Sequence, residues 1–473
     1  MSFSVLWNLT GSIIAKGSVV VFTLILARIL EPADFGIVAM ATMLVVISQT
    51  LASGGLGQAL VQQEQLQEHD ASTVFSVNLL ASIILYALVV LAAPYASVFF
   101  DEPRLTFVIK LAGLSLIITS LRISHIALMQ RAHQFDVLAK IQIFATLISG
   151  SFGVALAFFE YGFWSLIGQL LMQQLSITLG CFLHYRWRPK FHIDFMALNR
   201  LFGYGGRLAL SSFIGTLSRE SYTFIVARFF SAEVTGQYYF ARRINNLTQQ
   251  QLITPIQEAT FPALSQQQSD LPSVVVAIRK IGQVTSFMIA PMAVFIAILA
   301  EPLIMVVVGK KWLPAADYLQ ILSVLALLYP LHAISINVMK ITGRSDLVLR
   351  WSILRNILAL GLLLIAAPYG VKAIIASQIL VSVIILFPNA YHNKKLINYN
   401  YSQQVGDVIF NILSALLVGL VASICLNFYD THITQLIIGC ITYSLVYLGL
   451  AIATQNKGLN LIIPIVRKRL DLR

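Results

Sequence analysis

The stretch ARILEPADFGIVAMA, residues 27–41, returns two hundred residues later as ARFFSAEVTGQYYFA, residues 227–241. Both copies carry an Ala-Arg pair, a glycine and a further alanine at the same spacing. When the register is extended without gaps over residues 11–58 and 211–258, about ten of the roughly 48 pairs are identical. A repeat of this length indicates the duplication of a helical hairpin. Many carriers consist of two such halves that rock against each other, so the repeat favours transport over catalysis.

The composition is that of a protein with many membrane-spanning helices. Of the 473 residues, 58% are apolar and 11% are charged, whereas soluble domains carry about 25% charged residues. Apolar runs of about 20 residues recur, which is the length that a helix needs to cross about 30 Å of hydrocarbon. We count about fourteen, which begin near residues 9, 35, 72, 105, 137, 163, 207, 234, 278, 315, 347, 371, 405 and 433. The period-two alternation of an outer-membrane barrel is absent, so we predict an all-α integral membrane bundle.

The repeat divides the chain into two lobes and a C-terminal pair of helices. Six predicted helices lie in residues 1–200 and six in residues 201–398, and two more precede a basic tail in residues 399–473. Because six is even, both lobes enter the membrane from the same side. We therefore expect pseudo-symmetric lobes, related by an axis along the membrane normal, around a central cavity. The last two helices are either a peripheral addition or the lining of an opening toward lipid.

Basic residues concentrate on one side of the predicted spans. If the N-terminus is inside, about 18 cations lie in the inner loops and tail, against about four outside, at Arg104, Lys310, Lys311 and Lys372. This asymmetry predicts cytoplasmic termini, and it accounts for the net charge of +12 without nucleic acid. The first apolar run is long enough to span and no basic region precedes it, so we expect no cleavable signal peptide.

The segment between the two lobes has a basic and aromatic character. The sequence YRWRPK at residues 185–190 is followed by apolar residues at helical spacing, namely Phe191, Phe195, Leu198 and Phe202. This pattern predicts an amphipathic helix at the membrane interface. Anchoring of the topology is the favoured role, and contact with anionic lipid head groups is the alternative.

Polar stripes run along four of the predicted spans, and three of the stripes carry a cation. One stripe comprises Ser12, Lys16 and Thr23, and its duplicate comprises Ser212, Thr216, Arg219 and Thr223. The second span of each lobe carries Thr42 and Gln49 in the first copy and Arg242, Asn245 and Gln249 in the second. A charge inside a bilayer costs about 2.5–3.5 kcal/mol on insertion scales and commonly marks a functional site.

Fixed cations in a low-dielectric cavity attract a polyanionic group such as a diphosphate. We therefore expect the substrate-binding residues to be Lys16, Arg219, Arg242, Thr23, Thr223, Gln49, Gln249 and Asn245. The alternative for the cations is buried structural pairing, since Glu220 is close to Arg219 in the sequence. Duplicated Arg28 and Arg228 are instead expected to brace each hairpin, since each ends its span beside an acid, Glu31 or Asp34 in the first copy and Glu233 in the second. Gly36 and Gly236 are expected to permit either a tight turn or a close helix contact.

Sequence motifs for catalysis and metal binding are missing. We find no P-loop, no paired carboxylates in a plausible cleft and no cluster of His, Cys or acids with metal-ligand spacing. Cys181, Cys425 and Cys440 fall inside predicted spans, so we expect packing thiols and no disulfide. The sequence thus predicts a protein that is not an enzyme and that holds no metal or cofactor.

Two short motifs carry a family resemblance. LARILEPADFG at residues 26–36 resembles the first-hairpin motif of bacterial polysaccharide exporters, and GLGQALVQ at residues 55–62 is similar to the motif that closes their second helix. The similarity covers the whole chain and points to the colanic-acid and teichuronic-acid exporter branch. The superfamily also holds multidrug extruders and the lipid II flippase, with two six-helix lobes around a V-shaped cavity.

The resemblance implies a flippase of the bacterial inner membrane for surface polysaccharide synthesis. Its substrate would be an undecaprenyl-diphosphate-linked oligosaccharide, its partners glycosyltransferases and a polymerase, and its coupling ion H⁺ or Na⁺. A multidrug extruder is an alternative, although its cavity would favour acids. A membrane glycosyltransferase or polymerase usually has a sizeable loop bearing carboxylates or a His and Arg cluster, which is missing here. A non-transporting scaffold for envelope assembly would have the same composition, so composition does not separate it from a transporter.

Overall fold

The computed structural model describes residues 17–63, 65–67, 69–247, 271–342, 344–461 and 463. Within these ranges the regular structure is helical and includes no strand. Eleven helices there are long and apolar enough to cross a membrane: Pro32–Ser53, Asp70–Phe99, Leu105–Arg131, Phe135–Phe158, Trp164–His184, Pro272–Val307, Lys310–Met339, Asp346–Tyr369, Val371–Ile397, Tyr401–Leu426 and His432–Ala453. Each begins within two turns of a predicted span, which confirms the all-α membrane fold.

The other three predicted spans correspond to helices of a different kind. A shorter apolar helix covers Gly17–Ile29, and the preceding residues lie outside the described part of the chain. The span expected from residue 207 belongs to the long helix α9 (Phe195–Phe229). The span expected from residue 234 begins as a helix over residues 232–247. The count of fourteen spans stays a prediction.

The chain divides into two compact units, residues 1–239 and residues 240–473. The division falls after α9, because α9 packs against α2 and α3 of the first unit. The lobes expected at 1–200, 201–398 and 399–473 follow the sequence repeat, and their boundaries stay a prediction.

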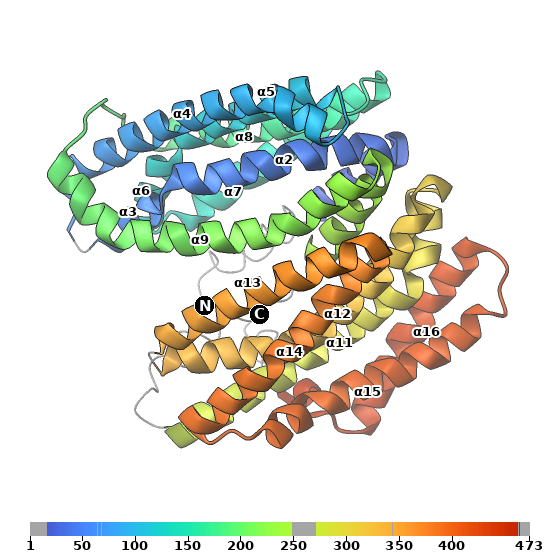
Figure 1. Cartoon of the computed structure of the whole chain (residues 1–473). Coiled ribbons are helices and arrows are strands. Elements are labelled where there is room, and N and C mark those ends of the chain that lie inside the picture. The colour runs from blue at the N-terminus through green and yellow to red at the C-terminus, as the bar shows by residue number, and fades with distance from the viewer. Residues whose placement is uncertain are drawn as a thin grey trace. The chain divides into compact units, whose positions relative to one another are not determined.

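The first unit is a bundle of long helices (Figure 1). Its helices after residue 29 are α2 (Pro32–Ser53), α3 (Leu56–Gln62), α4 (Asp70–Phe99), α5 (Leu105–Ser120), α6 (Ile123–Arg131), α7 (Phe135–Phe158), α8 (Trp164–His184) and α9. Helix α2 packs against α5 and α9, α4 against α5, and α7 against α8. The guanidinium of Arg131 donates to carbonyls at the end of α3, those of Leu60, Val61 and Gln63. A cation there complements the negative end of the helix dipole.

The two copies of the repeated motif contact each other through their glycines. A Cβ atom at Gly36 would overlap the carbonyl oxygen of Ala232, and a Cβ atom at Gly236 would overlap the carbonyl oxygen of Pro32. Pro32 and Ala232 occupy the same position in the two copies, so the contact is reciprocal. Only glycine lets two helix backbones approach this closely. The expected role of the glycines in close helix contact is therefore confirmed, and each glycine is found to meet the other copy.

The segment between α8 and α9 forms an extended connection and not a separate helix. Residues 185–194 are non-helical, and Asp194 begins α9 by accepting hydrogen bonds from the backbone N–H groups of Met196 and Ala197, at 2.8 and 3.3 Å. The amphipathic residues beyond Asp194 are the first turns of α9 itself, because this cap starts one helix of 35 residues. Phe195 is 77% exposed, as a residue at a membrane interface would be.

The second unit is arranged around α11 (Figure 1). Its described helices are α11 (Leu271–Val307), α12 (Leu313–Ile341), α13 (Ser345–Ala366), α14 (Val371–Ile397), α15 (Tyr401–Leu426) and α16 (His432–Ala453), together with part of the helix over residues 232–247 and two short 3₁₀ turns. Helix α11 packs against α12, α15 and α16. The C-terminal pair, α15 and α16, is thus bound to the core of this unit.

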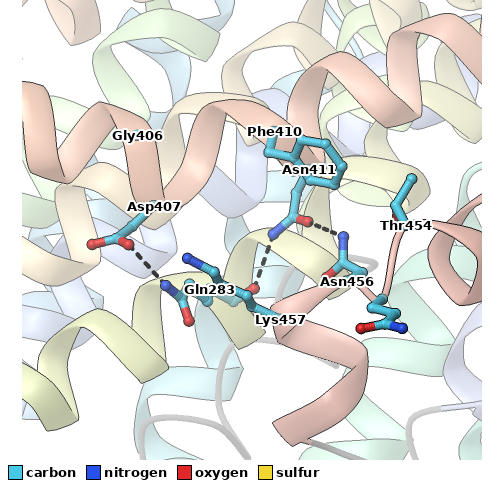
Figure 2. A pocket seen from close by; sticks show the side chains of 9 residues that line it. Gln283, Gly406, Asp407, Phe410, Asn411, Thr454, Asn456 and Lys457 are labelled. Carbon is cyan, nitrogen blue, oxygen red and sulfur yellow. Dashed lines mark hydrogen bonds between the residues drawn. The ribbon is translucent and has the colours of Figure 1, made fainter.

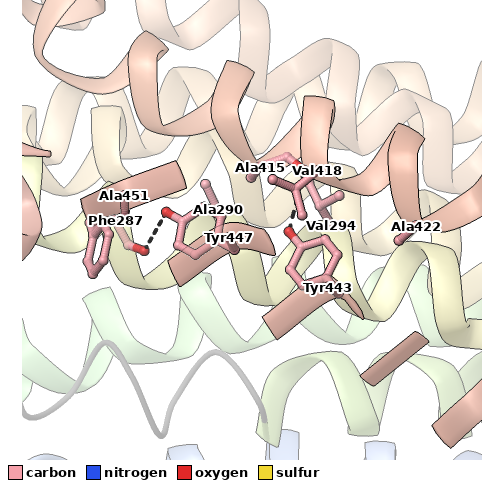
Figure 3. Close-up of a cluster of buried hydrophobic side chains, with 9 residues drawn as sticks. All are labelled: Phe287, Ala290, Val294, Ala415, Val418, Ala422, Tyr443, Tyr447 and Ala451. Atoms are coloured by element: carbon pink, nitrogen blue, oxygen red, sulfur yellow. Dashed lines mark hydrogen bonds between the residues drawn. The ribbon is translucent and has the colours of Figure 1, made fainter. Parts of the chain in front are cut away.

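Two tyrosines of α16 fix this packing (Figure 3). Tyr447 donates a hydrogen bond to the carbonyl of Phe287 in α11, at 3.2 Å, and Tyr443 donates to the carbonyl of Ala415 in α15, at 3.4 Å. Both rings are buried among small and branched side chains of the same helices. A buried hydroxyl needs such a partner, since an unpaired one would cost about 1–3 kcal/mol.

Candidate functional site

Arg219 lies on the polar stripe that the sequence predicted for α9. Its guanidinium donates a hydrogen bond to the hydroxyl of Thr216, at 2.9 Å, and its side chain is exposed in the described structure. Thr216 is buried, and its oxygen lies 3.4 Å from that of Thr50 in α2. The stripe of α9 therefore meets the second span of the first copy, and Arg219 stands at this contact.

The other candidate binding residues of the first unit differ in how many of their hydrogen-bonding groups are already bonded within the protein. Thr23 is buried and donates to the carbonyl of Val19, at 2.8 Å. Thr223 is buried on α9, and Gln49 is half-buried next to Thr50. A threonine that bonds to its own helix keeps only its acceptor lone pairs for a ligand. Among these candidates, the structure places Arg219 best for charge recognition, and the binding role of the set stays a prediction.

Arg242 and Asn245 belong to the second unit. They lie three residues apart on the helix over residues 232–247 and so share one face. Arg242 is half-buried, and Asn245 is 5% exposed. The two remaining candidates, Lys16 and Gln249, lie outside the described residues.

Two other membrane cations have structural partners. Arg122, 9% exposed, donates to the backbone oxygen of Gln174 at 3.0 Å and to its side-chain oxygen at 2.5 Å, which ties the α5–α6 junction to α8. Arg228 lies over the ring of Phe99, 5.0 Å from its centroid, where we expected it to brace against Glu233. A cation over an aromatic face is stabilised without a carboxylate. These contacts assign both arginines to the scaffold.

The sequence did not reveal an ion pair in the second unit between a partly exposed arginine and a buried aspartate. Arg279 of α11 donates to both carboxylate oxygens of Asp407 in α15, at 2.7 and 3.1 Å. Gln283 and the hydroxyl of Tyr399 also donate to Asp407, each at 2.8 Å. Burial and the bond to Asp407 raise the pKa of Tyr399, so its hydroxyl remains a donor. In the sequence, the only indication of this pair was a single acid, Asp407, near the start of an apolar span, with Asn411 one turn further on.

A cavity of about 310 Å³ adjoins this ion pair (Figure 2). Asn411 donates to the carbonyl of Gln283 at 3.1 Å and to the hydroxyl of Ser286 at 2.7 Å, and it accepts from Asn456 at 2.7 Å. The cavity is lined by Gln283, Gly406, Asp407, Phe410, Asn411, Thr454, Gln455, Asn456 and Lys457. The hydrogen bonds join α11, α15 and the segment after α16 into one polar floor.

Within the described ranges, no three or more His, Cys, Asp or Glu side chains are grouped as metal ligands would be. Cys181, Cys425 and Cys440 are free thiols. The polar groups described above are arginines, amides, hydroxyls and the carboxylate of Asp407, most of them set into membrane-spanning helices. Together with the fold, this defines a multi-pass helical membrane protein with polar sites inside its spans.

The chain belongs to the polysaccharide biosynthesis protein family, whose profile matches residues 25–317. The teichuronic acid biosynthesis protein TuaB of Bacillus subtilis (strain 168) is 22% identical over 65% of this chain, and the match spans 64% of TuaB. The succinoglycan biosynthesis transport protein ExoT of Rhizobium meliloti (strain 1021) is 25% identical over 94% of this chain and 91% of its own length.

The fold is also that of a solved structure. The lipid II flippase MurJ, in an inward closed conformation, superposes with a TM-score of 0.75 over 95% of this chain and 99% of its own. Sequence identity is 13%, so this likeness concerns the fold. It confirms the fold class expected from the repeat and from the family resemblance.

Proposed function

We propose that the protein is a flippase that carries undecaprenyl-diphosphate-linked oligosaccharide units across the bacterial inner membrane by alternating access. The units would serve surface polysaccharide synthesis. Membership of the polysaccharide biosynthesis family and the similarity to the teichuronic acid protein TuaB and the succinoglycan transport protein ExoT support the class of substrate. The fold shared with the lipid II flippase supports the mode of transport.

The observation that carries the proposal is the position of Arg219. Its guanidinium is exposed midway along a helix of the bundle, and its described hydrogen bond goes to a threonine hydroxyl. A guanidinium presents several N–H donors in a planar fork that matches phosphate oxygens. In the proposal Arg219, Lys16 and Arg242 hold the diphosphate, while Thr23, Thr223, Gln49, Gln249 and Asn245 bind sugar hydroxyls.

The orientation in the membrane follows the distribution of charge. The cation-rich loops and the C-terminal tail face the cytoplasm, and both termini lie on that side. The lipid-linked substrate then enters from the leaflet where soluble sugar donors are available. No bond is made or broken in the transport step, so the proposal assigns the chain no catalysis. An H⁺ or Na⁺ gradient would drive the cycle, and glycosyltransferases and a polymerase would act before and after it.

The test is translocation of lipid-diphosphate-linked oligosaccharide in proteoliposomes that contain equal amounts of each variant. Arg219→Ala is expected to reduce the initial rate at least tenfold, whereas Arg219→Lys keeps part of it, because the charge remains and the fork is lost. Arg344→Ala serves as the matched control, since Arg344 is exposed and paired with Asp346. Its rate should equal that of the wild type.

Two results would contradict the proposal in different ways. Full activity of Arg219→Ala would place the diphosphate site elsewhere and leave the transport function standing. An absence of transfer by the correctly folded wild-type protein would remove the flippase function itself and would favour a role in envelope assembly.

A further inference from the structure

We propose that the cavity formed by α11, α15 and the segment after α16 binds the head group of an anionic phospholipid. This site lies entirely within the second unit and is separate from the candidate substrate residues. It would hold a lipid of the surrounding membrane, and it does not depend on the flippase proposal.

The charge of the lining favours an anion. The two carboxylate oxygens of Asp407 accept four hydrogen bonds, two from Arg279 and one each from Gln283 and Tyr399. Asp407 is therefore neutralised and offers nothing to an ammonium group. Lys457 also lines the cavity, is exposed and forms no ion pair with a described residue. Because Arg279, just outside the lining, balances the charge of Asp407, Lys457 leaves a net positive charge at the cavity, which selects a phosphate without an attached amine.

The size of the cavity also restricts its ligand. A volume of about 310 Å³ is at the lower end of the range of small-molecule pockets, which is about 300–1,000 Å³. This space suits a phosphate with a short polyol such as glycerol. It is too small for an oligosaccharide. Amide side chains at Gln283 and Gln455, both in the lining, would meet the hydroxyl groups of the polyol.

An apolar stripe leads away from the cavity and provides a place for acyl chains. Phe410 lies in the cavity wall and is 48% exposed. It is followed along α15 by exposed apolar residues at helical spacing, namely Leu413, Leu417, Val421 and Ile424. These side chains share one face of the helix. A polar pocket that continues into an apolar stripe fits an amphiphile better than a free anion.

The experiment uses the purified full-length protein in a neutral detergent, titrated with phosphatidylglycerol or phosphatidylethanolamine and read by native mass spectrometry. We expect one tightly bound phosphatidylglycerol, and much weaker binding of phosphatidylethanolamine. Lys457→Gln should weaken the binding of phosphatidylglycerol about tenfold, the loss expected for a charged hydrogen-bond donor. Gly406→Leu should abolish it, because a Cβ atom at Gly406 meets no atom within 4 Å and the added side chain fills the cavity.

The controls separate filling of the cavity from general disturbance. Gly449→Leu adds the same side chain to α16 at a position where a Cβ atom also meets nothing within 4 Å, and it should bind lipid normally. Lys190→Gln removes an exposed cation of the first unit and should also bind normally. The proposal is overturned if Gly406→Leu retains the bound lipid, or if both lipids bind equally. It is also overturned if millimolar inorganic phosphate or the diphosphate carrier lipid displaces phosphatidylglycerol, since the site would then recognise another anion.

Discussion

The two copies of the repeated hairpin agree in their backbone contact and differ in their polar chemistry. Gly36 and Gly236 each lie against the other copy. Where the first copy has Thr42, the second has Arg242. The backbone contact allows no residue other than glycine at these two positions. The polar residues can differ between the copies if the substrate itself is asymmetric. A lipid-linked sugar is such a substrate, with a charged end and a neutral end.

The copies also start their second helices by different means. In the first, the carboxylate of Asp34 accepts a hydrogen bond from the backbone N–H of Glu31, at 3.0 Å, and closes a capping box. In the second, the position of Asp34 is taken by Val234, whose N–H donates to the hydroxyl of Ser231 at 3.3 Å. Both arrangements satisfy a free N–H at a helix start. The same fold requirement has therefore been met with different residues.

The largest effect is expected from disturbing the shared contact. Gly36→Ala or Gly236→Ala places a methyl group against a backbone carbonyl, which must separate the helices and should destabilise the protein by about 1–3 kcal/mol. Transport should fall at least tenfold. Gly17→Ala is the control, because a Cβ atom there meets nothing within 4 Å. Thermal unfolding in detergent and the transport rate measure both effects, and wild-type behaviour of both variants would refute the contact.

A smaller effect is expected from making the copies alike in charge. Arg242→Thr gives the second copy the residue of the first, Thr42, and removes one of the proposed diphosphate ligands. We expect the transport rate to fall about tenfold, the effect of losing one charged hydrogen bond, with little change in unfolding temperature. If the unfolding temperature falls and the activity per folded molecule does not, Arg242 is a structural residue.

Exchange of the helix caps should have a modest effect on stability alone. Asp34→Val removes the capping box from the first copy, and Ser231→Ala removes the cap from the second. Each change should lower the free energy of unfolding by about 0.5–2 kcal/mol. Unfolding by heat or denaturant compares the two, and equal losses would show that the caps are equivalent. No loss in either variant would show that tertiary packing holds the helix starts.

The smallest effect concerns an ion pair that lies beside the first copy. Arg104 lies near Asp34 and forms an ion pair with Glu102, at 2.8 Å. The hydrogen bond from Arg104 lowers the pKa of Glu102, so its stabilisation is present at neutral pH and is lost as the pH falls through that pKa. Because the side chain of Arg104 is 52% exposed, solvent screens the pair, and Glu102→Gln should cost about 0.2–1 kcal/mol at pH 7. The difference from the wild type should shrink and disappear as the pH falls through the lowered pKa of Glu102, and a difference that does not change with pH would exclude this ion pair as the cause.

The sequence predicted the helices well because apolar length alone sets the spans. It also predicted that the duplicated glycines make close contacts. It did not predict that the glycines of the two copies meet. A sequence repeat shows that two segments have a common origin, but it does not give the distance between them in the folded protein. The hydroxyl of Thr23 illustrates another limit, since a threonine on a polar stripe can face a ligand or bond to its own helix. Composition does not separate these two cases.

The Arg279–Asp407 pair was missed for a similar reason. Its members are 128 residues apart, and Arg279 looked like one more cation of an inner loop. In the structure α11 extends through that position. The arginine therefore pairs with a residue of α15 and is not merely a basic residue of a cytoplasmic loop. Pairing of this kind depends on the packing of distant helices, and no local pattern specifies it.

This ion pair also imposes an order on the synthesis of the protein. Helix α11 leaves the ribosome long before Asp407 exists, so Arg279 lacks this carboxylate partner until α15 has been made. An unpaired charge inside the bilayer would cost about 2.5–3.5 kcal/mol for each residue on insertion scales. The second unit can therefore mature only after its last helices have been made. A chain truncated before α15 would keep Arg279 without its carboxylate partner, and we expect cellular quality control to degrade such a chain.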